Sequence, residues 1–385
     1  MSGGRCAGVA LVFKTDSCYN VGKIAFVGAA EMERCKAHSL SLDVVRVLAT
    51  AMVLGVHAGQ SAGLDAFTRV GAYGVQLFFI LSVYLAEASL AAAFARPAPP
   101  QGRYRAYARR RLLRILPLYW LILAVRWLYD LVWYLAQGQT PVQVLAGPCG
   151  WRYLRYVFFL QMWLPSEDWS LWNNRNALWT MSAFAFFYLI APLLHRAFGS
   201  FRRGFALLLF CLLAKGFLGR AIEGALAGYP PAAMVSNFSA QTPLMVLYCF
   251  LFGFVLYHAV QEGRQLPYGG FCLLLPALFG FARCAYEGAY TVLVLLAVQF
   301  SAEALPLFAG PRGAALAGAV RFLSAGSFFV YLAHPMVLGL LPDVQGVPAP
   351  LAAGYFALAF VLCAAVCNLL YGLLIRRFEA HFQAL

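Results

Sequence analysis

The sequence predicts an all-α protein, a polytopic transmembrane helical bundle of about ten spans. Of its 385 residues, 62% are hydrophobic and only 11% are charged, whereas a soluble domain carries about 25% charged residues. Apolar segments of about 18–25 residues, the length that a helix needs to cross a bilayer, recur along the chain. Only helices and closed barrels span lipid, and these segments are too long and too evenly apolar for barrel strands.

The chain divides into an N-terminal tail and a transmembrane domain. Residues 1–40 contain no stretch long enough to span and no signal-peptide pattern, so we expect a disordered tail or an extension ahead of a natural start at Met32. Residues 41–385 form the transmembrane domain, with spans expected near 41–58, 71–93, 112–136, 177–197, 204–222, 243–261, 267–283, 288–307, 319–341 and 351–375. The short segment 153–165, with its Trp and Tyr residues, is expected to be interfacial or re-entrant.

The net charge of +14 has a source other than nucleic-acid binding. Arginines gather in the cytoplasmic loops of membrane proteins. In this chain they concentrate before the third and fifth predicted spans and after the tenth, among them Arg103, Arg105, Arg109, Arg110, Arg202, Arg203, Arg376 and Arg377. With an even number of spans, this distribution places both termini in the cytoplasm. We therefore predict a multi-pass protein of the plasma (inner) membrane and no nucleic-acid partner.

The first predicted span holds two ionisable residues, Arg46 and His57. Such residues are costly inside a membrane and indicate function by default. Eleven helical residues turn through about 1100° and rise about 16–17 Å, so both side chains lie on one face. The Arg suits a phosphate at the inner end and the His suits proton transfer deeper in, a separation close to the reach of an extended phosphopantetheine arm. The alternative is a snorkelling Arg and a core His bonded to a neighbouring carbonyl.

Other polar residues lie in or beside the spans. Arg111 and Arg114, at i,i+3, form part of a basic mouth at the inner end of the third span, suited either to a polyanionic cofactor or to anionic lipid. Arg126 and Asp130, at i,i+4, are expected to pair inside that span. His334, directly before Pro335, is either catalytic or structural.

The remaining histidines give no metal-binding pattern. His195 and His258 fall at the ends of predicted spans, where we expect them at the membrane interface. Neither stands at a metal-ligand spacing from another histidine, so no metal site is predicted.

Four stretches together resemble the acyltransferase 3 family of integral-membrane acyltransferases. "LDVVRVLATAMVLGVHAG" (42–59) is similar to the family's opening L-D-x-x-R-x₁₀-H, and "GVQLFFILSVYL" (74–85) to its second-helix motif. "RRRLLRILPLYW" (109–120) resembles its R-x-x-R followed by proline, and "SFFVYLAHP" (327–335) its late S-x-x-x-Y-L-x-H-P. Their order, their spacing and the ten-helix plan all agree, so the resemblance covers about residues 40–380.

The resemblance implies a function and site residues. Such proteins move an acyl group, often acetyl, from cytoplasmic acyl-CoA to a hydroxyl of an extracytoplasmic acceptor, commonly a saccharide. His57 corresponds to the proposed catalytic histidine and Arg46 to the motif arginine. Arg111 and Arg114 correspond to the pair thought to meet the CoA phosphates, with Arg46 as a further candidate. Acyl-CoA would be a co-substrate rather than a permanently bound cofactor, and the oligomeric state is not predicted.

The fourth span departs from the family pattern. Many sugar O-acetyltransferases of this family have W-S-L-S-V-E-E-Q-F-Y there, but this chain reads "WTMSAFAFFY" (179–188), with Phe184 and Ala185 in place of both glutamates. Another carboxylate near a span could orient His57 instead; the candidates are Asp43, Glu87 and Glu303, although Asp43 could simply pair with Arg46.

The sequence therefore predicts a membrane O-acyltransferase acting on a surface saccharide or glycolipid. Two alternatives stay open. One is a transporter or flippase for a lipid-linked saccharide, which would also place Arg and His around a polar cavity. The other is a family member that has lost catalysis, which the missing glutamates would fit.

Overall fold

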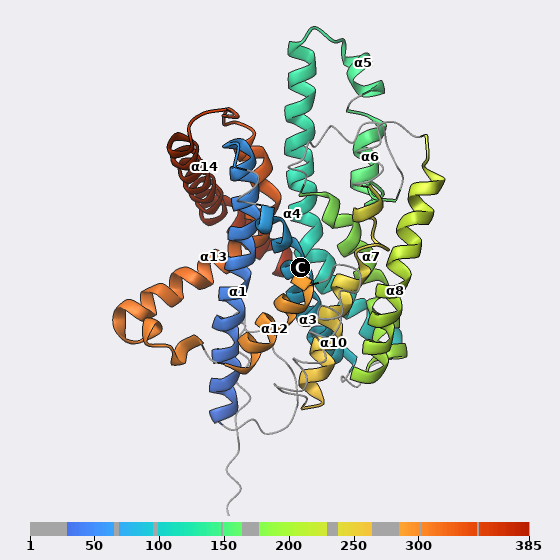
Figure 1. The fold of residues 1–385 in the computed structure, drawn as a ribbon, viewed down its shortest axis with the longest axis vertical. Coiled ribbons are helices and arrows are strands. Elements are labelled where there is room, and N and C mark those ends of the chain that lie inside the picture. The colour runs from blue at the N-terminus through green and yellow to red at the C-terminus, as the bar shows by residue number, and fades with distance from the viewer. Residues whose placement is uncertain are drawn as a thin grey trace, which may run out of the picture.

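The computed structural model describes residues 29–64, 69–94, 99–147, 149–163, 177–228, 238–263, 285–300, 302–344 and 346–384. Within these ranges every regular element is helical, as predicted (Figure 1). The longer helices are α1 (Ala29–Ser61), α3 (Gly74–Phe94), α4 (Pro100–Ala136), α7 (Trp179–Phe198), α8 (Phe201–Ala225), α10 (Leu247–Gln261), α12 (Ala285–Gln299), α13 (Gly310–Leu338) and α14 (Ala349–Leu370). Shorter elements are η1 (Arg69–Tyr73), α5 (Pro141–Ala146), α6 (Trp151–Val157), η4 (Ala302–Ala304), η5 (Pro306–Phe308), η6 (Tyr371–Ile375) and α15 (Arg376–Ala384).

The helices coincide with most of the predicted spans. Within the described ranges, 7 helices are long and apolar enough to cross a membrane: Leu40–Ser61, Gly71–Phe94, Gly102–Ala136, Trp179–Phe198, Phe201–Ala225, Gly310–Leu338 and Ala349–Phe382. The shorter apolar helices α10 and α12 fall on the predicted spans 243–261 and 288–307. The predicted span 267–283 lies outside the described residues. The first helix begins at Ala29, ahead of the predicted residue 41.

The centre of the bundle is formed by α1, α3 and α10. In Figure 1, α1 runs between α13 and α14 on one side and α3, α10 and α12 on the other. Helix α10 is buried along almost its whole length. It approaches α3 so closely that a Cβ built on Gly253 would lie 2.2 Å from the carbonyl oxygen of Ile80. Only glycine allows this backbone-to-backbone contact, which fixes the register of α3 against α10.

The outer helices turn apolar side chains away from the bundle. Helix α14 exposes Leu358, Val361 and Leu369, and α8 exposes Phe210 and Phe217. Exposed leucines and phenylalanines in such numbers would be unfavourable in water but match the surface that lipid chains require.

A buried polar contact joins α4 to α6. The predicted pair forms, with Nε of Arg126 3.0 Å from Oδ1 of Asp130. The hydroxyl of Tyr153, in α6, donates a hydrogen bond to Oδ2 of Asp130. Burial, followed by the hydrogen bond to Asp130, raises the pKa of Tyr153 well above its ordinary value, so the phenol stays protonated. The segment predicted to be interfacial or re-entrant thus packs its first turn against α4.

Candidate functional site

Arg46 lies in a polar cluster between α1 and α13. Its Nη1 donates hydrogen bonds to Oδ1 of Asp43, at 3.1 Å, and to the hydroxyl of Ser324 in α13, at 2.7 Å. That hydroxyl donates in turn to the same carboxylate oxygen at 2.5 Å. The Arg46 and Asp43 side chains are only 12% and 16% exposed, so the carboxylate compensates a guanidinium that has lost most of its water. Of the two roles left open for Asp43, the geometry shows the pairing with Arg46.

His57 also contacts α13, eleven residues further along α1. Its imidazole is stacked on that of His334, with ring centroids 5.0 Å apart and the planes inclined by 30°. Nδ1 of His57 lies 2.8 Å from the amide oxygen of Gln60. An amide oxygen can only accept, so Nδ1 carries the proton and Nε2 of the neutral ring has the lone pair. Gln60 therefore fixes the tautomer that a general base needs.

His334 is held by its own helix. Its Nδ1 lies 2.8 Å from the carbonyl oxygen of Tyr331 and 3.2 Å from that of Val330, one turn earlier. Nδ1 must therefore donate, and this backbone contact orients the ring. Proline at position 335 cannot donate to the carbonyl of Tyr331, which explains why that carbonyl is available to the side chain. The structural role foreseen for His334 is present in the geometry, together with a direct contact to His57.

The two ends of the pattern meet the same helix in the same order. Arg46 contacts Ser324, and His57 contacts His334, so α1 and α13 run in the same direction. The rise of 1.5 Å per residue separates the two contacts by about 16 Å along α1. The side chains share one face of α1, and that face is turned towards α13. Parallel packing is also what a ten-span order requires of its first and ninth helices.

The other motif stretches converge around His334. The hydroxyl of Tyr331 shares its one proton between two acceptors at the start of α7, Oγ1 of Thr180 at 3.1 Å and the carbonyl oxygen of Ala177 at 3.3 Å. The ring of Tyr331 also lies 5.4 Å from that of Phe78 in α3. Motifs from the first, second, fourth and ninth predicted spans thus meet in one region.

The position of the missing glutamates is apolar. Phe184 is 8% exposed, and its ring packs on Phe79, Phe250 and Tyr188, with centroids 5.1, 5.5 and 5.9 Å away. The family's first motif carboxylate is therefore replaced by part of an aromatic core. Gln60 is the group that this chain places against Nδ1 of His57. Sequence reasoning missed Gln60, although its i,i+3 spacing from His57 on a helix could have revealed it.

Arg111 and Arg114 have different surroundings. Arg111 is 7% exposed, and its Nη2 donates to the carbonyl of Leu85 at 2.9 Å. Its guanidinium lies 5.7 Å from the ring centroid of Tyr188 and 5.9 Å from that of Tyr107. Arg114 interacts electrostatically with Glu379 of α15. Residues at i,i+3 differ by about 60° around a helix, which is enough to direct the two guanidiniums to different neighbouring helices.

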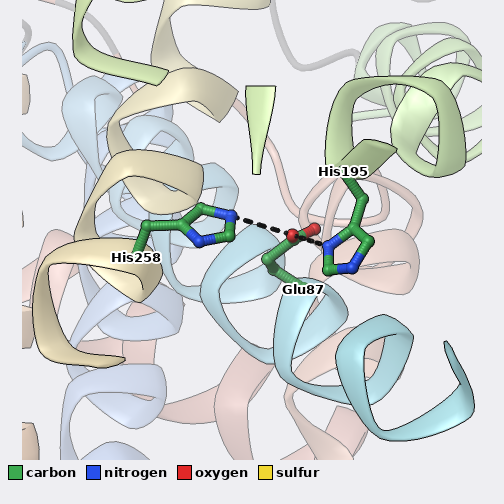
Figure 2. Close-up of side chains that lie close together, drawn as sticks. All are labelled: Glu87, His195 and His258. Carbon is green, nitrogen blue, oxygen red and sulfur yellow. Dashed lines mark hydrogen bonds and ion pairs between the residues drawn. The ribbon is translucent and has the colours of Figure 1, made fainter. Parts of the chain in front are cut away.

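A second cluster brings His195 and His258 together. Both residues contact the carboxylate of Glu87, which their positions at the ends of predicted spans did not predict (Figure 2). Their place at the membrane interface stays a prediction. The potential ligand atoms of the three residues all lie within 4.8 Å of one another. Spacing along the chain does not reveal this cluster, because its three residues come from three separate helices, α3, α7 and α10. Glu87 lies with these histidines, while Glu303 lies where side chains are not described.

The comparisons with known proteins agree with the motifs. No curated protein and no solved structure matches the chain. The model of the acyltransferase 3 family, described as an acyltransferase domain, matches residues 39–372, which include all four motif stretches and both ends of the α1–α13 contact. This multi-helix membrane protein therefore belongs to the acyltransferase 3 family.

Proposed function

We propose that the protein is a membrane O-acyltransferase that moves an acyl group, acetyl by the resemblance, from cytoplasmic acyl-CoA to a hydroxyl of an extracytoplasmic saccharide or glycolipid. Family membership supports acyl transfer. The observation that carries the assignment to specific residues is the pair of contacts along α1, with Arg46 at one end and His57 at the other.

His57 is the proposed general base. Its Nε2 takes the proton of the acceptor hydroxyl as the oxygen attacks the thioester carbonyl. The carbon–sulfur bond then breaks, and the CoA thiolate leaves and recovers the proton, giving an ester and free CoA. Gln60 orients the ring but cannot neutralise an imidazolium as a carboxylate would, so this site differs electrostatically from His–carboxylate pairs.

The proposed donor path begins at the cytoplasmic end. With both termini in the cytoplasm, Arg46 lies nearer the inner side and His57 nearer the outer side. The CoA phosphates would be bound by Arg111, Arg114 and Arg46, and the extended arm would bring the thioester towards His57. The separation of about 16 Å along α1 supports this arrangement. Arg46 could turn to a phosphate by exchanging its contact with Asp43 for one of similar charge.

The test is transfer by purified protein. Detergent-solubilised protein is incubated with labelled acetyl-CoA, and hydrolysis and transfer to saccharide acceptors are measured. A general base contributes about 10²–10⁴-fold, so His57→Ala should lower the rate by that factor. His381→Ala, which changes an exposed histidine of α15, serves as the control and should keep the wild-type rate. Full activity in His57→Ala would remove the catalytic assignment.

The acceptor is tested in cells. Mass spectrometry of surface glycans from cells with and without the protein should show a difference of one acyl unit. A wild-type protein that neither hydrolyses nor transfers acetyl-CoA would instead favour the flippase or the catalytically inactive alternative. Altered export of a lipid-linked saccharide would separate these two.

A further inference from the structure

Glu87, His195 and His258 converge on one point inside the bundle. Figure 2 shows both imidazoles directed at the carboxylate, His195 from α7 and His258 from α10, with Glu87 on α3 between them. Oε1 of Glu87 accepts from Nδ1 of His195 and from Nε2 of His258, the latter at 3.1 Å. The Glu87 side chain is 0% exposed, and the His195 and His258 side chains are 19% and 8% exposed. Three elements of the fold thus deliver two ring nitrogens and a carboxylate to the same place.

Hydrogen bonding alone leaves this cluster incomplete. Both imidazoles use the same oxygen of Glu87, while the other oxygen, Oε2, is buried and has no hydrogen-bond partner among the described residues. A buried charged oxygen without a partner is costly. A cation between the three side chains would use the atoms that already converge, and it would also give Oε2 a partner by bidentate coordination.

We propose that Glu87, His195 and His258 form a binding site for a divalent transition-metal ion of the zinc type. Imidazole nitrogens and a carboxylate are a ligand set that Zn²⁺ prefers, at about 2.0–2.2 Å. Those bond lengths place ligand atoms about 3.4 Å apart around a tetrahedral ion. The three atoms lie within 4.8 Å of one another, so the site needs only small adjustments of side chains to close around the ion.

The position of the site indicates a structural role. On α3, Glu87 stands nine residues after Phe78, which packs beside the Tyr331–His334 region. This difference corresponds to about 13 Å along the helix, so the ion would lie well away from His57. It would instead tie α3, α7 and α10 together at the opposite end of the bundle. The guanidinium of Arg111 donates a hydrogen bond to the carbonyl of Leu85, two residues before Glu87. Acyl transfer would therefore depend on the ion through the stability of these helices and the position of Arg111.

The competing arrangement is a carboxylate paired with a protonated histidine and no metal. The two arrangements differ in their response to metal. Coordination requires Nδ1 of His195 and Nε2 of His258 to give up the protons that they now donate, so binding shifts tautomers or releases protons. An ion-paired cluster would not bind added metal.

The experiment uses the full-length protein in detergent, stripped with a chelator and titrated with Co²⁺, which reports its coordination by visible absorption. We expect saturable binding with ligand-field bands, and competition by Zn²⁺. Glu87→Gln should weaken binding by at least about 100-fold, since even indirect partners of metal ligands are worth 10–100-fold. His381→Ala should bind like the wild type, because that exposed histidine lies on α15.

His258→Cys tests coordination directly. This variant keeps a metal ligand at position 258, so the Co²⁺ complex should gain a thiolate-to-metal charge-transfer band that the wild type lacks. The titration of the wild-type protein tests metal binding without depending on whether any variant folds. A wild-type protein that binds no Co²⁺ or Zn²⁺ would overturn the proposal. Binding that survives in Glu87→Gln but disappears in His381→Ala would overturn it too, because it would show an adventitious surface site.

Discussion

The imidazole of His57 lies against the imidazole of His334, with ring centroids 5.0 Å apart. His57 belongs to the first motif of the chain and His334 to the last, so the two ends of the family match meet at this stack. Each ring has its Nδ1 directed at an oxygen acceptor, Gln60 for one and the Tyr331 carbonyl for the other. The chemical role proposed for His57 and the supporting role of His334 can therefore be tested separately.

Substitutions of His334 should distinguish a structural role of this residue from a catalytic one. His334→Phe keeps an aromatic ring against His57, so we expect turnover to stay within about tenfold of wild type, below the effect of losing a general base. His334→Ala leaves a cavity beside His57 and should lower the free energy of unfolding by about 2–4 kcal/mol. Turnover and thermal unfolding of both variants are measured. If folded His334→Phe loses as much activity as His57→Ala, His334 takes part in the chemistry.

Replacing Arg111 and Arg114 by lysine should have different effects on stability. Arg111→Lys loses the directed contact with the Leu85 carbonyl and with two tyrosine rings, and should cost about 1.5–3 kcal/mol of stability. Arg114 is half-buried, so Arg114→Lys should change stability less than Arg111→Lys. If both residues bind CoA phosphates, both variants should raise the Kd for acyl-CoA, measured by calorimetry. Exposed Arg109→Lys is the control, and an unchanged Kd in both variants would reject the phosphate role.

The contact between α3 and α10 should not tolerate a methyl group. In Gly253→Ala the new Cβ would collide with the backbone oxygen of Ile80, and overpacking of this kind costs about 1–3 kcal/mol. Gly216→Ala, on the open face of α8, has no atom within 4 Å of the added Cβ and should be neutral or stabilise by up to about 1 kcal/mol. Thermal unfolding of the two variants is compared. Equal stability would mean that α3 and α10 are further apart than described.

Tyr153 gives a prediction for pH. Its phenol donates to Asp130, and Tyr153→Phe should lower the free energy of unfolding by about 1–3 kcal/mol. Its folded-state pKa is raised above the ordinary 10.0, first because of burial. The stability supplied by the protonated phenol is therefore complete below pH 10 and lost as the pH rises above it.

The measurement for Tyr153 is the difference in unfolding free energy between wild type and Tyr153→Phe across this range. It should be constant below pH 10 and shrink at higher pH. Tyr104→Phe, which changes an exposed tyrosine of α4, should show a small difference throughout. A difference for Tyr153 that grows with rising pH would contradict the assigned direction.

Local patterns in the sequence were sufficient where the physics is local. Apolar length predicted the helices, because a helix satisfies its own backbone hydrogen bonds whatever it packs against. The i,i+4 spacing predicted the Arg126–Asp130 pair for the same reason. Spacing along one helix also placed Arg46 and His57 on a common face, and the motifs predicted the family that the comparison shows.

Patterns within single segments of the sequence could not predict the contacts between helices. His195 and His258 stand at helix ends in the sequence, yet packing of α7 and α10 against α3 brings both to the buried carboxylate of Glu87. Arg111 and Arg114 are neighbours on one helix, yet they reach different partners because other helices surround α4. The sequence by itself determined that this protein is a bundle of membrane helices of one family, because apolar length, helical spacing and motifs are properties of single segments. Only the tertiary structure decided which polar groups meet, since that depends on the relative rotation and register of helices distant in the chain.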